Sequence, residues 1–269
     1  MTQSDKAFTG SIPALYDRYM GPMMFQPYAV DLAARVAALA PSAVLETAAG
    51  TGIVTAQLAK VLPDAALITA TDLNQAMLDV AAAKSTSREI AWQACDATLL
   101  PFANGTFDCV LCQFGVMFFP SKLDAFKEAR RVLRPGGKFL FSVWDSLELS
   151  PILETVSDAV AACYPADPPN FMRRTPFGYH DVVAITNQLA EAGFKTITSD
   201  AVTLPSSCPA AHDAAIGPCH GSPLRSEIEE RDANGLAAAT DAAAAALVAR
   251  FGDGPIESTM QAIVFTATR

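Results

Sequence analysis

Three acids and one turn of small residues are spaced as a nucleoside-binding site would require. Glu46 ends an apolar run and is followed by the small residues of the turn 48–52, while Asp72 and Asp96 each follow a later apolar run. Small residues allow a ligand to press against bare backbone. A carboxylate at Asp72 can accept hydrogen bonds from both hydroxyls of a ribose, and one at Asp96 can accept from the exocyclic amine of an adenine. The pattern therefore predicts bound adenosine.

The residues beside the turn indicate which adenosine ligand is bound. A dinucleotide-binding turn favours the pattern G-x-G-x-x-G, but Thr55 occupies the place of the third glycine. Such a turn also offers a helix N-terminus to a pyrophosphate, whereas Glu46 places negative charge beside it. A carboxylate suits a ligand that carries an ammonium or sulfonium charge. The residues therefore favour S-adenosylmethionine over a nicotinamide dinucleotide.

Alternating strand and helix patterns must position these residues. Nearly continuous apolar runs predict strands over Ala43–Ala49, Ala66–Asp72, Ile90–Cys95, Phe107–Gly115 and Lys138–Trp144. Amphipathic patterns between them predict helices over Thr51–Leu62, Asn74–Lys84 and Lys122–Leu133. Apolar strands separated by such helices are typical of a parallel sheet that is covered on both faces.

The rest of the chain is less regular. Residues 146–180 and 205–257 are expected to be insertions that form a cap, and two further strands, Lys195–Leu204 and Ser258–Thr268, are expected to add an antiparallel edge. Residues 1–40 are expected to be helical, either as a lid over the ligand or as a helix docked on the sheet. We therefore predict one α/β domain over 1–269, with its cofactor-binding core at 41–145. Its sheet is doubly wound, seven-stranded and mostly parallel, and its last strand is antiparallel.

The chain resembles the class I S-adenosylmethionine-dependent methyltransferases, in the small-molecule group similar to the quinone-biosynthesis C-methyltransferases. The motifs that carry the resemblance are VLETAAGTG at 44–52, TDLN at 71–74, CDA at 95–97, FDCV at 107–110, Gln113-Phe114 and RVLRPGG at 131–137. Ala48 is a departure, because the family usually has Gly there. The resemblance implies that the cofactor contacts Glu46, Ala48, Gly50, Gly52, Asp72, Leu73, Met77, Asp96, Ala97 and Gln113.

Within that set, the resemblance implies that Glu46 acts on the ammonium group of the methionine portion and that Gln113 closes over that portion. Leu73 and Met77 would pack against the adenine. Several alternatives stay open. Asp72 and Asp96 could simply cap turns, Leu73 and Met77 could belong to the core, and Gln113 could be a satisfied polar group at a strand end.

The methyl acceptor is predicted to be a small, largely hydrophobic metabolite. The expected pocket residues are aromatic or Met side chains, namely Tyr19, Met20, Met24, Phe118, Phe119 and Phe171. The basic pair Arg173-Arg174 could hold a carboxylate on the acceptor or could simply be solvated. No catalytic residue is assigned, although His180, His212 and His220 are candidate bases, and their spacing does not favour a metal site.

Composition limits the remaining choices. The net charge of −9 argues against nucleic acid as a partner, and no membrane span or signal peptide is predicted, so a cytoplasmic protein with free thiols is expected. Two other functions stay open: a module that binds S-adenosylmethionine without catalysis, and a nicotinamide-dependent oxidoreductase. The sequence does not indicate the oligomeric state.

Overall fold

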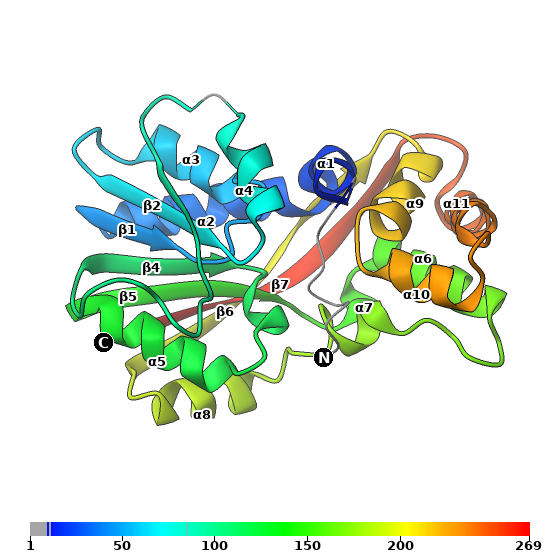
Figure 1. Ribbon diagram of the computed structural model, residues 1–269. Helices are drawn as coiled ribbons and strands as arrows, with labels where there is room; N and C mark the ends of the chain where they lie inside the picture. The colour runs from blue at the N-terminus through cyan, green and yellow to red at the C-terminus, as the bar shows by residue number, and fades with distance from the viewer. Residues whose placement is uncertain (1–9, 11, 85) are drawn as a thin grey trace. The chain divides into compact units, whose positions relative to one another are not determined.

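The computed structural model describes residues 10, 12–84 and 86–269 (Figure 1). Its strands are β1 (Ala43–Glu46), β2 (Leu67–Asp72), β3 (Ala91–Ala94), β4 (Phe107–Gln113), β5 (Leu133–Trp144), β6 (Lys195–Cys208) and β7 (Ile256–Thr268). The helices before β5 are α1 (Ile12–Leu15), a π-helix (Tyr16–Phe25), α2 (Gln26–Ala38), α3 (Ile53–Val61), α4 (Gln75–Ala82), a 3₁₀ turn (Val116–Phe118) and α5 (Lys122–Val132). Those after β5 are a 3₁₀ turn (Leu147–Leu149), α6 (Pro151–Cys163), α7 (Phe171–Arg174), α8 (Val182–Glu191), α9 (Ala211–His220), α10 (Leu224–Arg231) and α11 (Leu236–Phe251).

The strands form one seven-stranded sheet in the order β3-β2-β1-β4-β5-β7-β6. The pairs β3–β2, β2–β1, β1–β4 and β4–β5 are parallel. Strand β7 runs antiparallel to β5, because the amide of Arg269 donates to Gly137 and the amide of Asp145 donates to Gln261. These observations confirm the predicted fold class. The strand order reverses at β1, so the carboxyl ends of β1, β2 and β4 meet where such sheets bind ligands.

The described chain divides into two compact units. Unit 2 comprises Tyr28–Val143, Tyr179–Val202 and Ala262–Arg269. Within it, α2, α3 and α4 lie on one side of the sheet, and α5 and α8 lie on the other (Figure 1). One core cluster joins α2 to the sheet, since Leu32, Val44, Leu111 and Val264 are all buried in it. On the other side, Phe126 packs against the β5 side chains Phe139 and Phe141.

Unit 1 comprises Met1–Pro27, Trp144–Gly178 and Thr203–Gln261. A row of aromatic rings runs through it, with Tyr16 stacked on Phe25 at 4.7 Å between ring centroids and Trp144 stacked on Phe177 at 5.9 Å. Phe25 and Trp144 join the two pairs at 6.0 Å. The rings give unit 1 a core of its own.

The π-helix of unit 1 lies close against α9. A Cβ added at Gly217 of α9 would lie only 3.0 Å from the Cγ of Met20. A larger residue at position 217 would require Met20 or Tyr19 to shift by a few tenths of an ångström, so glycine eases this close approach.

The structure corrects several expected boundaries. The first strand ends at Glu46 rather than Ala49, because the chain turns immediately after the acid. The stretches expected to be irregular contain α6 and α9, and α9 holds Pro218 within its last turns. The stretch expected as one helix over Ser222–Arg250 is divided into α10 and α11.

The expected lid over 1–40 is also divided. Residues 1–9 and 11 lie outside the described residues, the π-helix belongs to unit 1, and most of α2 belongs to the core of unit 2. The two expected cap insertions fall largely within unit 1, and their role as a cap stays a prediction. In the described part of the chain, no helix is both long enough and apolar enough to cross a bilayer.

Candidate cofactor site

The turn after β1 has an unusual backbone that brings several amide groups inward. Ala48, Gly50 and Gly52 have φ angles of 52°, 56° and 75°, so every second residue is left-handed. The amides of Thr47 and Ala49 donate to the carbonyl groups of Leu111 and Thr71, and the amide of Gly52 donates to Ala49. A phosphate-binding turn would aim such amides at its ligand. Here these amides donate to carbonyl groups of the protein itself, which does not favour a pyrophosphate as the ligand.

Glu46 is buried at the carboxyl end of β1, with 1% of its surface exposed. Its Oε2 accepts a hydrogen bond of 2.6 Å from the Oγ1 of Thr55, which lies in α3 and is fully buried. The pKa of Glu46 is raised to about 8, chiefly by burial; the Thr55 hydrogen bond lowers it, and the nearby charge of Asp72 adds a smaller increase. A cationic ligand group would offset this cost of burial and favour the ionised carboxylate.

Asp72 at the end of β2 ties the neighbouring turns together. Its Oδ2 accepts from the amide of Gly50 at 2.9 Å, and its Oδ1 accepts from the amide of Asn74 at 2.8 Å. Burial raises the pKa of Asp72, although these hydrogen bonds favour its charged form. A carboxylate oxygen can accept more than one hydrogen bond, so the turn-capping role and a role in binding ribose are compatible.

The adenine side of the predicted site lies beyond β3. The Oδ1 of Asp96 accepts from the amide and the hydroxyl of Thr98, both at 2.8 Å, so this acid does cap a turn. Asp96 is exposed, and Ala97 beside it is half-buried. Register places Asp72 opposite Ala94, which brings the ends of β2 and β3 together.

Leu73 and Met77 follow Asp72 along the chain. Leu73 is 52% exposed, whereas Met77 is buried beneath the turn, with its Cε 3.7 Å from a Cβ built on Gly50. Met77 therefore belongs to the core at this position, and Leu73 projects where a flat ligand could rest on it.

The carboxyl end of β4 completes the arrangement within unit 2. Gln113 ends the strand and is half-buried, and Phe114 follows with a φ of 53°, which is strained for a bulky residue. A Cβ built on Gly115 would lie 2.4 Å from the Cβ of Ala48. The side chain at 48, which departs from the family pattern, therefore fits only because position 115 is a glycine.

Ser142 of β5 is a buried polar residue that the sequence did not single out. It lies opposite Gln113 in the register and is 1% exposed, and its Oγ has no hydrogen-bond partner among the described residues. Strand alternation places it on the same face as Leu140, which shares the core cluster of α2. Buried hydroxyls without partners are uncommon and call for an explanation.

The predicted acceptor residues fall in both units. Met20, Met24 and Phe171 are buried in unit 1, and Tyr19 is half-buried there. Phe118 and Phe119 are half-buried in unit 2. Their role in an acceptor pocket stays a prediction.

The basic pair of unit 1 is already engaged. Arg173 forms ion pairs with Glu148 and Asp158, and Arg174 forms one with Glu227. These contacts weaken the case for Arg173 and Arg174 as carboxylate ligands.

The candidate bases fall in both units, with His212 and His220 in unit 1 and His180 in unit 2. His220 hydrogen-bonds to Thr240 at 3.0 Å, and the exposed His212 lies 3.9 Å from a carboxylate oxygen of Asp241. Next to His180, Asp181 caps α8 by accepting from the amides of Val183 and Ala184. Among the residues that the structure describes, no cluster of three His, Cys, Asp or Glu side chains could hold a metal ion.

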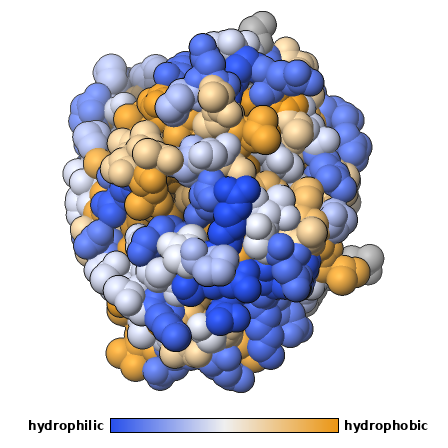
Figure 2. All heavy atoms as spheres, turned by 90° about the vertical axis from the view of Figure 1, so that its left-hand side faces the viewer, coloured by the Kyte–Doolittle hydropathy of each residue, from blue (hydrophilic) through white to orange (hydrophobic). Residues whose placement is uncertain are grey.

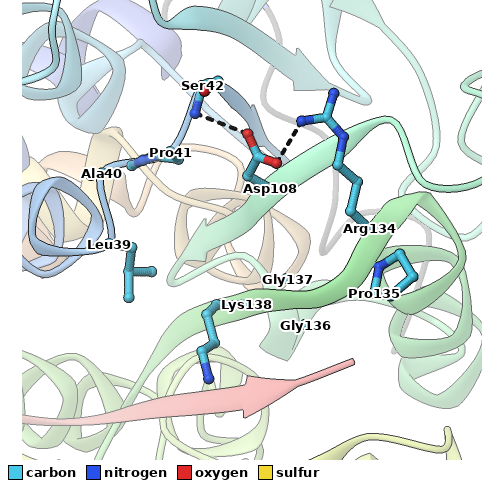
Figure 3. A pocket seen from close by; sticks show the side chains of 10 residues that line it. All are labelled: Leu39, Ala40, Pro41, Ser42, Asp108, Arg134, Pro135, Gly136, Gly137 and Lys138. Atoms are coloured by element: carbon cyan, nitrogen blue, oxygen red, sulfur yellow. Dashed lines mark hydrogen bonds and ion pairs between the residues drawn. The ribbon is translucent and has the colours of Figure 1, made fainter.

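A pocket of about 420 Å³ lies at the opposite edge of the sheet, where β1, β4 and β5 begin (Figure 3). Its polar groups satisfy one another: Asp108 accepts from the amides of Ser42 and Ala43 and from Arg134, while Lys138 donates to Thr268. Hydrophilic residues cover much of the face on this side of the molecule (Figure 2). Because none of the acids of the predicted site lines it, this pocket is separate from that site.

Comparison with known proteins shows which family the segment that contains the turn 48–52 and Asp72 resembles. A family model described as a methyltransferase domain matches residues 45–141. Residues 45–141 form a class I methyltransferase domain. The ubiquinone/menaquinone biosynthesis C-methyltransferase UbiE of Cellvibrio japonicus (strain Ueda107) is 37% identical over 101 residues. That alignment covers 36% of this chain and 41% of UbiE, so the methyltransferase domain matches less than half of its curated relative.

Solved structures are similar in fold to the chain as a whole. The YcgJ protein from Bacillus subtilis aligns with a TM-score of 0.57 and 19% identity, covering 90% of this chain and 98% of YcgJ. The [4+2]-cyclase SpnF aligns with a TM-score of 0.60 and 18% identity, covering 96% of this chain and 93% of SpnF. At this identity the likeness supports the fold and leaves the reaction to be argued from the site.

The contacts show which residues of the methyltransferase domain the sequence reasoning missed. Thr55 was noted only as the residue that breaks a glycine pattern, yet it holds Glu46. Asn74 was noted only within a motif, yet its amide fixes Asp72. A buried acid followed nine residues later by a hydroxyl in the next helix was the available signal. Ser142 falls within the predicted strand Lys138–Trp144, so its burial was expected, but nothing in the sequence singled out its hydroxyl.

Proposed function

We propose that the protein transfers a methyl group from S-adenosylmethionine to a small, largely hydrophobic metabolite. The observation that carries this proposal is the turn 48–52, which is fixed between Glu46 and Asp72 at the point where strand order reverses. It supports the assignment because a carboxylate at each end of a glycine turn suits a ligand with an ammonium at one end and a ribose diol at the other.

The residues present fit this cofactor. Gly50 and Gly52 allow the left-handed backbone of the turn, and Leu73 offers an exposed apolar surface beside Asp72. When bound, S-adenosylmethionine supplies a methyl group on a positively charged sulfur, which a nucleophile removes by in-line displacement. The work left to the protein is alignment and exclusion of water.

The acceptor is the least determined part of the proposal. The Met and aromatic residues predicted to line its pocket support a hydrophobic metabolite, as does the similarity to a C-methyltransferase of ubiquinone and menaquinone biosynthesis. The ion pairs of Arg173 and Arg174 do not favour an acidic acceptor. No residue is assigned as a general base, because a base is required only when the acceptor must lose a proton in the rate-limiting step.

Binding of S-adenosylhomocysteine, measured by isothermal titration calorimetry, tests the cofactor assignment. We expect a dissociation constant in the micromolar range or below for the wild type. Asp72→Asn should weaken binding by about 1–3 kcal/mol because one acceptor oxygen becomes a donor. Asp64→Asn, an exposed acid just before β2, is the matched control and should bind like the wild type. If the wild type gives no binding heat, the proposal is wrong.

Turnover separates catalysis from binding alone. Formation of S-adenosylhomocysteine should be followed with a panel of phenols, amines and keto acids as acceptors. A module that only binds the cofactor would give none with any of them, and binding of NADH in a fluorescence titration would favour the oxidoreductase instead.

A further inference from the structure

Thr55 makes a contact that its place in a helix does not require. A hydroxyl within a helix usually bonds the carbonyl four residues earlier, which here is that of Thr51. The ammonium of Lys84 donates to that carbonyl at 2.7 Å, and the hydroxyl of Thr55 bonds Glu46 of β1 instead. Both partners are almost fully buried, so this bond persists without competition from bulk water. It selects one oxygen and one orientation of the Glu46 carboxyl group.

The surroundings of Glu46 leave its negative charge poorly supported. The groups that face it are the Thr55 hydroxyl from α3, the Asp72 carboxylate from β2 and the Cys112 thiol from β4. One hydrogen bond favours its ionised form, whereas burial and a neighbouring carboxylate oppose it. Without a cationic ligand, these surroundings favour the protonated form of Glu46.

We propose that Thr55 is a positioning residue that orients Glu46 toward the ammonium group of the adenosyl amino acid, and that the ligand binds with release of the Glu46 proton. This inference rests on the function proposed above. Protons and charges balance in this binding step. The neutral carboxyl group of Glu46 loses its proton to solvent, and the resulting carboxylate lies opposite the incoming ammonium group.

Two ligands distinguish this role from a general structural one. S-adenosylhomocysteine carries the ammonium group, whereas 5′-methylthioadenosine has the same adenosine portion and lacks the amino acid. Titration calorimetry with wild type, Thr55→Val and Thr55→Ser should be run from pH 6 to pH 8. Repeating each titration in two buffers of different ionisation enthalpy counts the protons released.

For the wild type we expect close to one proton released at pH 7, and affinity for S-adenosylhomocysteine that rises by up to about tenfold per pH unit below the pKa of Glu46. Thr55→Val should weaken that ligand by about ten- to a hundredfold at pH 7, because a hydrogen bond to a charged group is lost. Its pH profile should also move to higher pH. Thr55→Ser should restore both, and 5′-methylthioadenosine should bind all three proteins alike at every pH.

Several outcomes would overturn the inference. Binding of S-adenosylhomocysteine by the wild type without proton release would do so even if Thr55→Val failed to fold. Equal weakening of both ligands by Thr55→Val would show that Thr55 merely maintains the turn. Unchanged binding of S-adenosylhomocysteine by Thr55→Val would show that the Thr55 hydroxyl does not orient Glu46. Failure of the wild type to bind either ligand would instead contradict the proposed function.

Discussion

Replacing Glu46 with glutamine should make the ligand-free protein more stable while it weakens cofactor binding. The pKa of Glu46 is raised from 4.5 to about 8 in the folded protein, so the folded state binds the proton more tightly than the unfolded chain does. The stabilisation from this proton is complete below about pH 4.5 and is lost as pH rises toward 8. The amide introduced by Glu46→Gln would not titrate, yet its carbonyl oxygen could still accept from Thr55.

The size of the effect follows from the linkage relation. Each pH unit between those two values costs the wild type about 1.4 kcal/mol, or about 5 kcal/mol across the whole range as an upper limit. Glu46→Gln should therefore gain several kcal/mol over the wild type at pH 8 and about 1 kcal/mol or less at pH 5. Asp72 is present in both proteins, but its charge raises the pKa of Glu46, so the difference between the two proteins includes the coupling of these two acids.

The assay is urea unfolding of both proteins without ligand at pH 5, 6.5 and 8, with calorimetry of S-adenosylhomocysteine binding at pH 7. Unfolding should be followed by two probes, because two compact units need not unfold together. A stability difference that stays constant with pH would show that Glu46 is ionised in the ligand-free protein. That result would refute the electrostatic argument, even if cofactor binding were lost.

Three further predictions can be checked by chemical denaturation. Gly52→Ala should cost more stability than Gly136→Ala by about 1–3 kcal/mol, because both positions have positive φ but only a Cβ at 52 meets other side chains; equal losses would contradict this. Ala48→Gly should stabilise the protein by up to about 1 kcal/mol by relieving a left-handed alanine, and a loss would show that the methyl packs well. Ser142→Ala should be neutral or stabilising, whereas Ser206→Ala, which loses a buried bond to the Met23 carbonyl, should cost about 1 kcal/mol; matching losses would indicate an ordered partner at Ser142.

The sequence predicted the part of the fold in which local pattern and packing agree. Strands β1 and β4 are mostly apolar and mostly buried, as expected for strands that are covered on both faces. Cys109 and Cys112 of β4 are fully buried, in agreement with their place in an apolar strand. The Arg131–Gly137 motif also led into β5 as expected, although the strand is assigned from Leu133.

The prediction was weaker where helices contain residues that usually interrupt them. Gly217 and Pro218 lie within α9, and Pro22 lies within the π-helix, so propensity favoured loops or a simple helix at these places. Tertiary contacts overrode it, as in the close approach of Gly217 to Met20. At the candidate site, the acids at the strand ends were identified from spacing. The hydroxyl that holds Glu46 was not, because its partner is chosen by three-dimensional contact.

The core cluster of unit 2 sets a practical limit on dissecting this protein. Leu32 from α2, Val44 from β1 and Val264 from β7 are buried together with Leu111, yet these three lie outside the matched segment 45–141. A fragment trimmed to that segment would lose the side chains that shield these strands and would expose apolar surface prone to aggregation. Chimeras that exchange reaction specificity between such enzymes should therefore carry the flanking helix and the returning C-terminal strand along with the motif-bearing core.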